Sequence, residues 1–211
     1  MTDNDEGCGL YLITPAAIPD VAAFAKTLAG VLATGAVSCV QLRLKDVENS
    51  VVESAAALLL PVCHQYDVPL LINDYAELAA KVGADGVHLG QEDGDVAAAR
   101  TLLGADKEIG VTCHSSRHLG FEAGEAGANY VAFGAFFESH TKTDATLADK
   151  EVLTIWDEVT DIACVAIGGI TPTNCKELAD AGAHFVAVCD AVWAHSEGPE
   201  KAVLAFQKAL L

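Results

Sequence analysis

Short apolar runs and longer amphipathic stretches alternate along the whole chain. Most of the apolar runs are rich in β-branched residues and lack an every-second-residue alternation, which is typical of strands buried on both faces. The stretches between them are rich in alanine and have a helical spacing of apolar positions, as in "VAAFAKTLAGVLATG" and "AVLAFQKALL". The predicted strands are residues 9–14, 37–44, 69–74, 85–90, 108–113, 129–137, 163–169 and 184–189.

Eight strand–helix units in succession predict an α/β fold, a single (β/α)8 TIM barrel. The alternative is an open doubly wound sheet, but no G-x-G-x-x-G motif follows the first strand. The sequence contains no stretch with the composition of a linker. We therefore expect one barrel domain over residues 1–211.

The net charge and the cysteines limit which binding partners and which cellular compartment we expect. The chain carries 30 acidic and 12 basic residues, a formal net charge of −18, which disfavours nucleic acid because a phosphate backbone needs a basic face. No apolar run approaches the roughly 18 residues that span a bilayer, and the acidic start "MTDNDEG" is unlike a secretory or transit peptide. The seven cysteines form no C-x-x-C pair and are interpreted as reduced, packed thiols. We expect a cytoplasmic protein without a membrane or nucleic-acid partner, and the sequence leaves a homo-oligomer open.

Three of the twelve basic residues lie where a barrel places its active site, at the carboxyl ends of strands. In "QLRLKD" the polar residues Gln41, Arg43 and Lys45 alternate with leucines, so their side chains would share one face. Lys142 follows the sixth strand. Cations gathered at this rim in an acidic protein predict a site for a polyanion.

Two carboxylates follow neighbouring strands at the same rim. Asp74 comes after the third strand and Asp93 after the fourth. They are suited to give Mg²⁺ its one or two carboxylates while phosphate oxygens complete its shell. A second phosphate site is predicted at "AIGGIT", because Gly168 and Gly169 let the backbone after the seventh strand approach an anion closely.

Five segments together resemble the thiamine phosphate synthase family, also called thiamine-phosphate pyrophosphorylase. They are "VQLRLKD", "INDYAELAAKVGADGVHLGQED", "IGVTCHSS", "YVAFGAFFESHTK" and "VAIGGIT", and the resemblance runs over residues 10–188. It implies an Mg²⁺-dependent transferase of thiamine biosynthesis. Such an enzyme joins hydroxymethylpyrimidine diphosphate to thiazole phosphate, releasing pyrophosphate through a dissociative, carbocation-like step.

The resemblance also implies roles for individual residues. Arg43, Lys45 and Lys142 would be the catalytic cations beside the departing diphosphate, and Asp74 and Asp93 the Mg²⁺ ligands. The residues expected to hold the pyrimidine diphosphate are Gln41, Arg43, Lys45, Asn73, Thr112 and Lys142. Those expected to hold the thiazole phosphate are Ser139, Thr141, Gly169, Cys189 and Asp190.

Two segments depart from the family's pattern. The family usually has T-x-T-K after the sixth strand, where this chain has Ser139, His140, Thr141 and Lys142, and serine keeps the hydroxyl. At the end of the eighth strand the usual residue is small or hydroxylated, whereas Asp190 is a carboxylate that would repel a phosphate.

Some of these residues also have structural interpretations. Asp74 and Asp93 could each be a helix N-cap instead of a metal ligand. His88, inside "GVHLG", is interpreted as a core histidine with its hydrogen bonds satisfied, and His118 as a surface residue.

Two other functions compete with the synthase. A thiazole tautomerase of the same fold would need a histidine just after the sixth-strand glycine, where this chain has Ala135. A non-catalytic barrel that binds a phosphorylated metabolite is favoured by Asp190.

Overall fold

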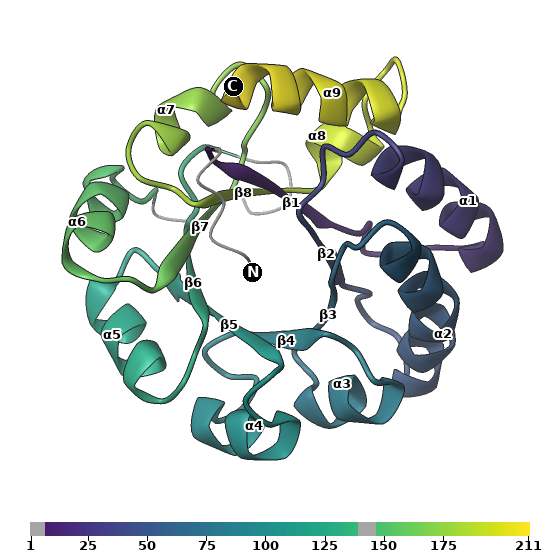
Figure 1. Cartoon of the computed structure of the whole chain (residues 1–211), viewed down its shortest axis with the longest axis horizontal. Coiled ribbons are helices and arrows are strands. Elements are labelled where there is room, and N and C mark those ends of the chain that lie inside the picture. Colours follow the sequence, from purple (N-terminus) through teal and green to yellow (C-terminus); the bar gives the residue numbers. More distant parts are fainter. Residues whose placement is uncertain (1–6, 139–146) are drawn as a thin grey trace.

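The chain folds into a closed barrel of eight parallel strands that follow one another in sequence order (Figure 1). The computed structural model describes residues 7–138 and 147–211. The strands are β1 (Gly9–Ile13), β2 (Cys39–Leu42), β3 (Leu70–Asn73), β4 (Gly86–Leu89), β5 (Glu108–His114), β6 (Tyr130–Gly134), β7 (Ala163–Ile167) and β8 (Phe185–Val188). The predicted (β/α)8 barrel is confirmed, and the open doubly wound sheet is wrong.

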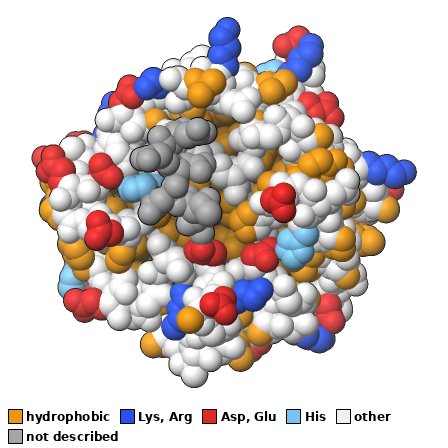
Figure 2. All heavy atoms as spheres, viewed as in Figure 1, with side chains coloured by type: hydrophobic (Ala, Val, Ile, Leu, Met, Phe, Trp, Pro, Cys, Tyr) orange, Lys and Arg blue, Asp and Glu red, His pale blue; other side chains and the backbone are white. Residues whose placement is uncertain are grey.

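Helices surround the barrel, as Figure 1 shows, and the short α8 lies on the barrel side of α9. They are α1 (Val21–Leu32), α2 (Asn49–Gln65), α3 (Ala76–Val82), α4 (Val96–Leu103), α5 (Arg117–Glu125), α6 (Glu151–Val159), α7 (Cys175–Ala179), α8 (Asp190–Trp193) and α9 (Pro199–Leu210). None of the helices in the described ranges combines the length and apolar character needed to cross a bilayer. On the face that Figure 2 shows, basic side chains stand apart from one another with acidic ones between them.

All eight predicted strands exist, but their ends differ from the sequence pattern. The second strand, for example, was expected over residues 37–44 and its ladder covers Cys39–Leu42. The sixth ends at Gly134, although Phe136 beyond it is still 95% buried, with 5% exposed. Apolar residues beyond a ladder pack beneath the surrounding helices, so an apolar run is longer than the strand it contains.

The core has two layers. The larger layer lies between the strands and the helices. The smaller fills the barrel itself and consists of Tyr11, Ile13, Cys39, Leu71, Tyr130, Ala132, Val165 and Ala187. Side chains alternate across a strand, so this inner set continues towards the carboxyl ends through Gln41 on β2 and Thr112 on β5.

The first and last strands close the barrel, and α8 fastens this seam. Leu10 pairs with Val186 across β1 and β8. The indole Nε1 of Trp193 in α8 donates to the carbonyl oxygen of Ile13 at 2.7 Å. The same indole packs against Phe24 of α1, with ring centroids 4.9 Å apart. The end of β1 is therefore tied to a helix that follows β8.

Candidate active site

The end of β2 is held against the end of β1. Gln41 is 2% exposed, Arg43 is half-buried and Lys45 is exposed. The backbone N–H of Arg43 donates to the hydroxyl of Thr14 at 2.9 Å, and Thr14 is itself only 1% exposed. The N–H of Thr14 in turn donates to the carbonyl of Gln41 at 3.0 Å. The ladder of β2 ends at Leu42, so Thr14 takes over the positioning of Arg43 where the sheet stops.

Asp74 and Asp93 come together beside these cations. The Asp74 carboxyl hydrogen-bonds with that of Asp93. Burial first, then the charge of Asp93 and this hydrogen bond, raise the pKa of Asp74 to about 6. The nearby charges of Arg43 and Lys45 act in the opposite direction. The two carboxyl groups therefore repel each other when both are ionised, and the cations only partly compensate.

Neither aspartate is a helix N-cap, so that interpretation was wrong for both. The N-cap of α3 is Tyr75, and the N-cap of α4 is Asp95, whose Oδ1 accepts from Ala98 N at 2.7 Å. Asp74 has a left-handed backbone, with φ 68°, which removes it from the start of α3. Its N–H donates to the carbonyl of His88 at 2.7 Å, so a bond to β4 fixes this turn.

The carboxylate pair fits a magnesium ion that shares its shell with a phosphate. Mg²⁺ is usually held by one or two carboxylates, with water and substrate phosphate supplying its other oxygens. Within residues 7–138 and 147–211, no group of three or more His, Cys, Asp or Glu side chains could hold a metal by itself. A cation between Asp74 and Asp93 would relieve the repulsion that raises the pKa of Asp74.

Thr112 is held by two residues of the fourth βα unit. Gln91 Nε2 donates to its carbonyl oxygen at 2.6 Å, and His88 Nε2 lies 2.8 Å from its hydroxyl oxygen. The other nitrogen of His88, Nδ1, lies 2.9 Å from the hydroxyl of Tyr130. Burial and then the charge of Arg43 lower the pKa of His88 to about 4, against the influence of Asp93. His88 is thus a satisfied histidine, as expected, but its partner Thr112 belongs to the predicted site.

Cys189 and Asp190 lie together at the end of β8. Cys189 is half-buried, and its thiol contacts the carbonyl oxygen of Thr14 at 3.4 Å. Burial raises the pKa of Cys189 to about 12, assisted by the charge of Asp190 and a hydrogen bond with it. Asp190 is exposed and is the first residue of α8. Cys189 is therefore a protonated thiol that bridges the ends of β8 and β1.

The glycine pair after β7 permits a close approach between two loops. Gly169 has φ 64°, and a Cβ there would lie 2.5 Å from the carbonyl oxygen of Glu138. Asn174 holds the other side of the loop: its Nδ2 donates to Gly169 O at 3.1 Å and its Oδ1 accepts from Thr171 N at 2.7 Å. The loop after β7 thus needs glycine to pack on the loop after β6, and phosphate binding there stays a prediction.

The remaining predicted residues divide into two groups. Asn73, the last residue of β3, is half-buried and pairs in register with His88. Ser139, His140, Thr141 and Lys142 lie outside the described residues. Thr14 was missed by sequence reasoning, although a polar residue directly after a buried strand was a usable signal.

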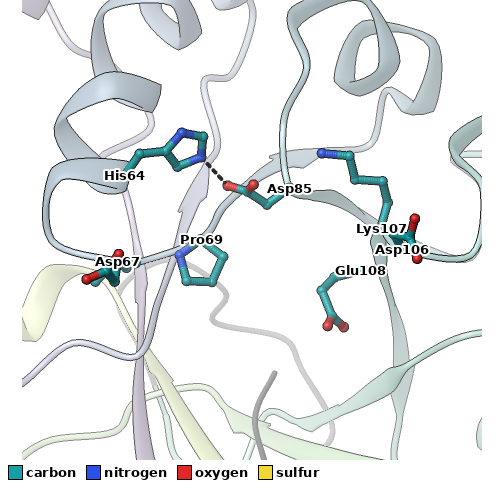
Figure 3. A pocket seen from close by; sticks show the side chains of 8 residues that line it. His64, Asp67, Pro69, Asp85, Asp106, Lys107 and Glu108 are labelled. Atoms are coloured by element: carbon teal, nitrogen blue, oxygen red, sulfur yellow. Dashed lines mark hydrogen bonds and ion pairs between the residues drawn. The ribbon is translucent and has the colours of Figure 1, made fainter.

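A pocket of about 360 Å³ lies at the other end of the barrel. Its lining residues precede β3 and β4 and lie at the start of β5, and His64 Nε2 and Asp85 Oδ2 meet there at 2.9 Å (Figure 3). Asp85 also accepts from the backbone N–H of Leu70 at 2.8 Å. This hollow lies at the amino ends of the strands, away from Arg43 and Asp74, whereas barrels of this type carry their active residues at the carboxyl ends.

Known proteins share both the sequence and the fold. The family model described as thiamine monophosphate synthase matches residues 10–192. A thiamine-phosphate synthase of Rhodospirillum centenum is 52% identical over 210 residues, covering 100% of this chain and 99% of that one. One of Hyphomonas neptunium is 47% identical, covering 93% of this chain and 91% of that one.

A solved structure agrees with these sequence matches. The thiamine phosphate pyrophosphorylase of Pyrococcus furiosus superposes with a TM-score of 0.84 at 29% identity, covering 96% of this chain and 95% of that one. The resemblance in the five segments is confirmed over nearly the whole length. The chain belongs to the thiamine monophosphate synthase family.

Proposed function

We propose that this protein is a thiamine-phosphate synthase that condenses hydroxymethylpyrimidine diphosphate with thiazole phosphate and releases pyrophosphate. The observation that carries the proposal is the group at the carboxyl ends of β2, β3 and β4. There, Arg43 and Lys45 lie close enough to the Asp74–Asp93 pair to alter the pKa of Asp74. Two cations and two carboxylates suit one diphosphate and one divalent ion.

The chemistry asks for charge stabilisation more than for a nucleophile. The bond between the pyrimidine's methylene carbon and the diphosphate oxygen breaks, and both electrons leave with the oxygen. The aminopyrimidine ring stabilises the resulting carbocation, which the thiazole nitrogen then attacks. Negative charge grows on the departing diphosphate, and Arg43 and Lys45 are positioned to stabilise it. Mg²⁺, when bound by Asp74 and Asp93, would add positive charge at the diphosphate.

Positioning by the barrel supports this assignment. Arg43 is fixed through its backbone by the buried Thr14, so its guanidinium starts from a rigid strand end. Gln41 is buried in the same register and offers an amide to the pyrimidine. Preorganised groups of this kind need little rearrangement when charge develops, which is why they lower a barrier effectively.

The tautomerase is disfavoured by the residue after Gly134. The side chain of Ala135 is a methyl group, which can act neither as an acid nor as a base. It packs so closely on Gly168 that a Cβ at that glycine would clash with it. The non-catalytic barrel rests on Asp190, which is exposed at the start of α8. Only an assay of product formation separates that second function from the synthase.

The test is formation of thiamine phosphate from the two purified substrates with Mg²⁺, measured together with the pyrophosphate released. We expect one pyrophosphate for each thiamine phosphate, loss of both with chelator, and severe loss in Arg43→Ala. Lys26→Ala, a substitution on α1, serves as the control and should match the native protein. Substrate binding without any product, at saturating substrates and Mg²⁺, would refute the synthase and favour the non-catalytic barrel.

A further inference from the structure

We propose that His88 is a positioning residue that, together with Tyr130 and Tyr11, turns the hydroxyl proton of Thr112 into the active site. The inference rests on the proposed function, in which Thr112 lies beside the pyrimidine diphosphate. The inference specifies which partner donates the proton in the contact between Thr112 and the substrate. Thr112 would donate to an acceptor atom of this substrate because its own oxygen is already occupied by His88.

Three hydrogen bonds in a row connect the interior of the barrel to Thr112. Tyr11 and Tyr130 lie with their hydroxyl oxygens 2.9 Å apart, and the next two distances are 2.9 Å from Tyr130 to His88 Nδ1 and 2.8 Å from His88 Nε2 to Thr112. Tyr11 and Tyr130 are 2% and 0% exposed. The chain of groups therefore runs from a dry core to the half-buried Thr112 at the end of β5.

The barrel holds these rings in place tightly. Tyr130 occupies the space that a side chain at Gly110 would fill, because a Cβ there would lie 1.8 Å from the Tyr130 ring. The ring of Tyr130 stacks with that of His88 at a centroid distance of 5.7 Å. Gly110 also pairs in register with His88 across β4 and β5. Neither ring can move far, so the hydrogen bonds keep their partners.

The number of protons available determines which group donates in each of these three hydrogen bonds. A neutral imidazole has one nitrogen that donates and one that accepts, and the two ring nitrogens of His88 contact hydroxyl oxygens, with no carboxylate of the described residues at hydrogen-bond distance to favour a charged ring. In one arrangement, Tyr11 donates to Tyr130, Tyr130 donates to Nδ1, and Nε2–H donates to Thr112. Every buried proton then has an acceptor, and the proton of Thr112 is left for the site.

The reverse arrangement leaves the hydroxyl proton of Tyr11 without an acceptor. Thr112 would donate to Nε2, Nδ1–H to Tyr130, and Tyr130 to Tyr11. Within the described residues, the Tyr11 hydroxyl has Tyr130 as its hydrogen-bond partner, and the surrounding inner cluster is apolar. A buried donor without an acceptor is unfavourable, so the first arrangement, with its proton on Nε2, is preferred.

The backbone of Thr112 is fixed as well. Gln91 Nε2 donates to its carbonyl oxygen at 2.6 Å. The fourth βα unit thus holds both the carbonyl and the hydroxyl of one residue of β5. A threonine held at two points presents its proton in one direction, which is the preorganisation that a binding contact to an anionic substrate needs.

The tautomer can be measured without any assay of activity. Long-range ¹H–¹⁵N correlation spectra of the ¹⁵N-histidine-labelled protein distinguish an imidazole protonated at Nε2 from one protonated at Nδ1. We expect the Nε2–H form for His88, whose signals are assigned by their loss in His88→Gln. The Nδ1–H form, or an imidazolium at neutral pH, would overturn the proposed direction, even if the protein proves to be a synthase.

Kinetic measurements test whether His88 influences substrate binding through Thr112. His88→Leu should raise KM for the pyrimidine diphosphate, or lower kcat/KM for it, by roughly tenfold or more, while His88→Gln, which keeps an N–H, should recover much of this loss. In a Thr112→Val background, His88→Leu should add less than about twofold, since coupled residues are not additive. The same His→Leu change at the exposed His118 is the control and should be neutral.

Additive losses from His88→Leu and Thr112→Val would contradict a role of His88 through Thr112. An equal change in KM for the thiazole phosphate would point to a general structural role and would likewise refute positioning. If the native protein forms no thiamine phosphate, the proposed function fails, whereas the tautomer measurement still decides the direction of the row.

Discussion

Replacing Asp74 by asparagine should stabilise the fold in the absence of metal. The pKa of Asp74 is raised from its ordinary 3.8 to about 6. A carboxyl with a raised pKa binds its proton more tightly in the folded state, so ionisation opposes folding. The penalty is absent well below pH 4, where both states are protonated, and it is complete well above pH 6, where both are ionised. Removing the ionisable group at pH 8 therefore removes the full penalty.

The magnitude follows from the shift. One pKa unit is worth about 1.4 kcal/mol, so the difference between 3.8 and about 6 corresponds to about 3 kcal/mol at most. Asp74 is only half-buried, and solvent screens part of this energy, so we expect a gain of about 1–2 kcal/mol in the free energy of unfolding at pH 8. Asparagine also tolerates the left-handed backbone at this position, where φ is 68°.

Urea denaturation followed by tryptophan fluorescence, with chelator present, measures this gain. It should fall to about half at pH 5, where the folded carboxyl is mostly protonated and the unfolded one mostly ionised. Asp46→Asn is a matched control, because Asp46 is exposed and has a similar backbone, with φ 55°. Its effect should stay within about 0.5 kcal/mol.

Mg²⁺ should make the native protein more stable than Asp74→Asn, which reverses their order of stability without metal. A ligand that binds only the folded state stabilises it by an amount that grows with its concentration, so Mg²⁺ should stabilise the native protein more than Asp74→Asn. A loss of stability in Asp74→Asn at pH 8, or a gain that does not change with pH, would refute the electrostatic reasoning.

Three further substitutions test other parts of the site. Arg43→Ala should reduce kcat/KM by about two to three orders of magnitude with little change in melting temperature, and unchanged kinetics with a large fall in Tm would mark it as structural. Thr14→Val leaves the N–H of Arg43 without its acceptor and should cost about 1–3 kcal/mol of stability as well as activity, while Thr14→Ser should restore both; equal loss in the serine variant would exclude the hydroxyl as the cause. Asp190→Ser should lower KM for the thiazole phosphate by less than about tenfold, because the exposed carboxylate is predicted to turn away from the phosphate; a far larger fall would show that Asp190 blocks that site.

The sequence pattern predicted the strands because each one is an apolar run long enough to be buried on both faces. It could not predict where a ladder stops. Leu42 ends β2, but the alternation continues to Lys45, because backbone contacts with Thr14 and Ala16 keep the chain extended beyond the sheet. Local rules allowed Asp74 to be an N-cap, whereas the hydrogen bond that its N–H donates to His88 on the neighbouring strand sets its backbone.

The histidine in β4 shows the same limit at longer range. Its place in a buried strand was readable, and so was its need for hydrogen-bond partners. Which groups satisfy it depends on the closure of the barrel, since Tyr130 follows His88 by 42 residues and Tyr11 precedes Tyr130 by 119. No spacing rule within one segment contains that information.

The seam between β1 and β8 bears on how the protein becomes active during its synthesis. Trp193 reaches Ile13 across 180 residues, and Cys189 reaches Thr14 across 175. Contacts so distant along the chain form late in folding, because long loops must close before they are made. Thr14 is also the residue that anchors Arg43. A nascent chain still lacking β8 and α8 therefore has an open edge at the strand that anchors Arg43, so we expect the proposed activity only once the last βα unit has been made.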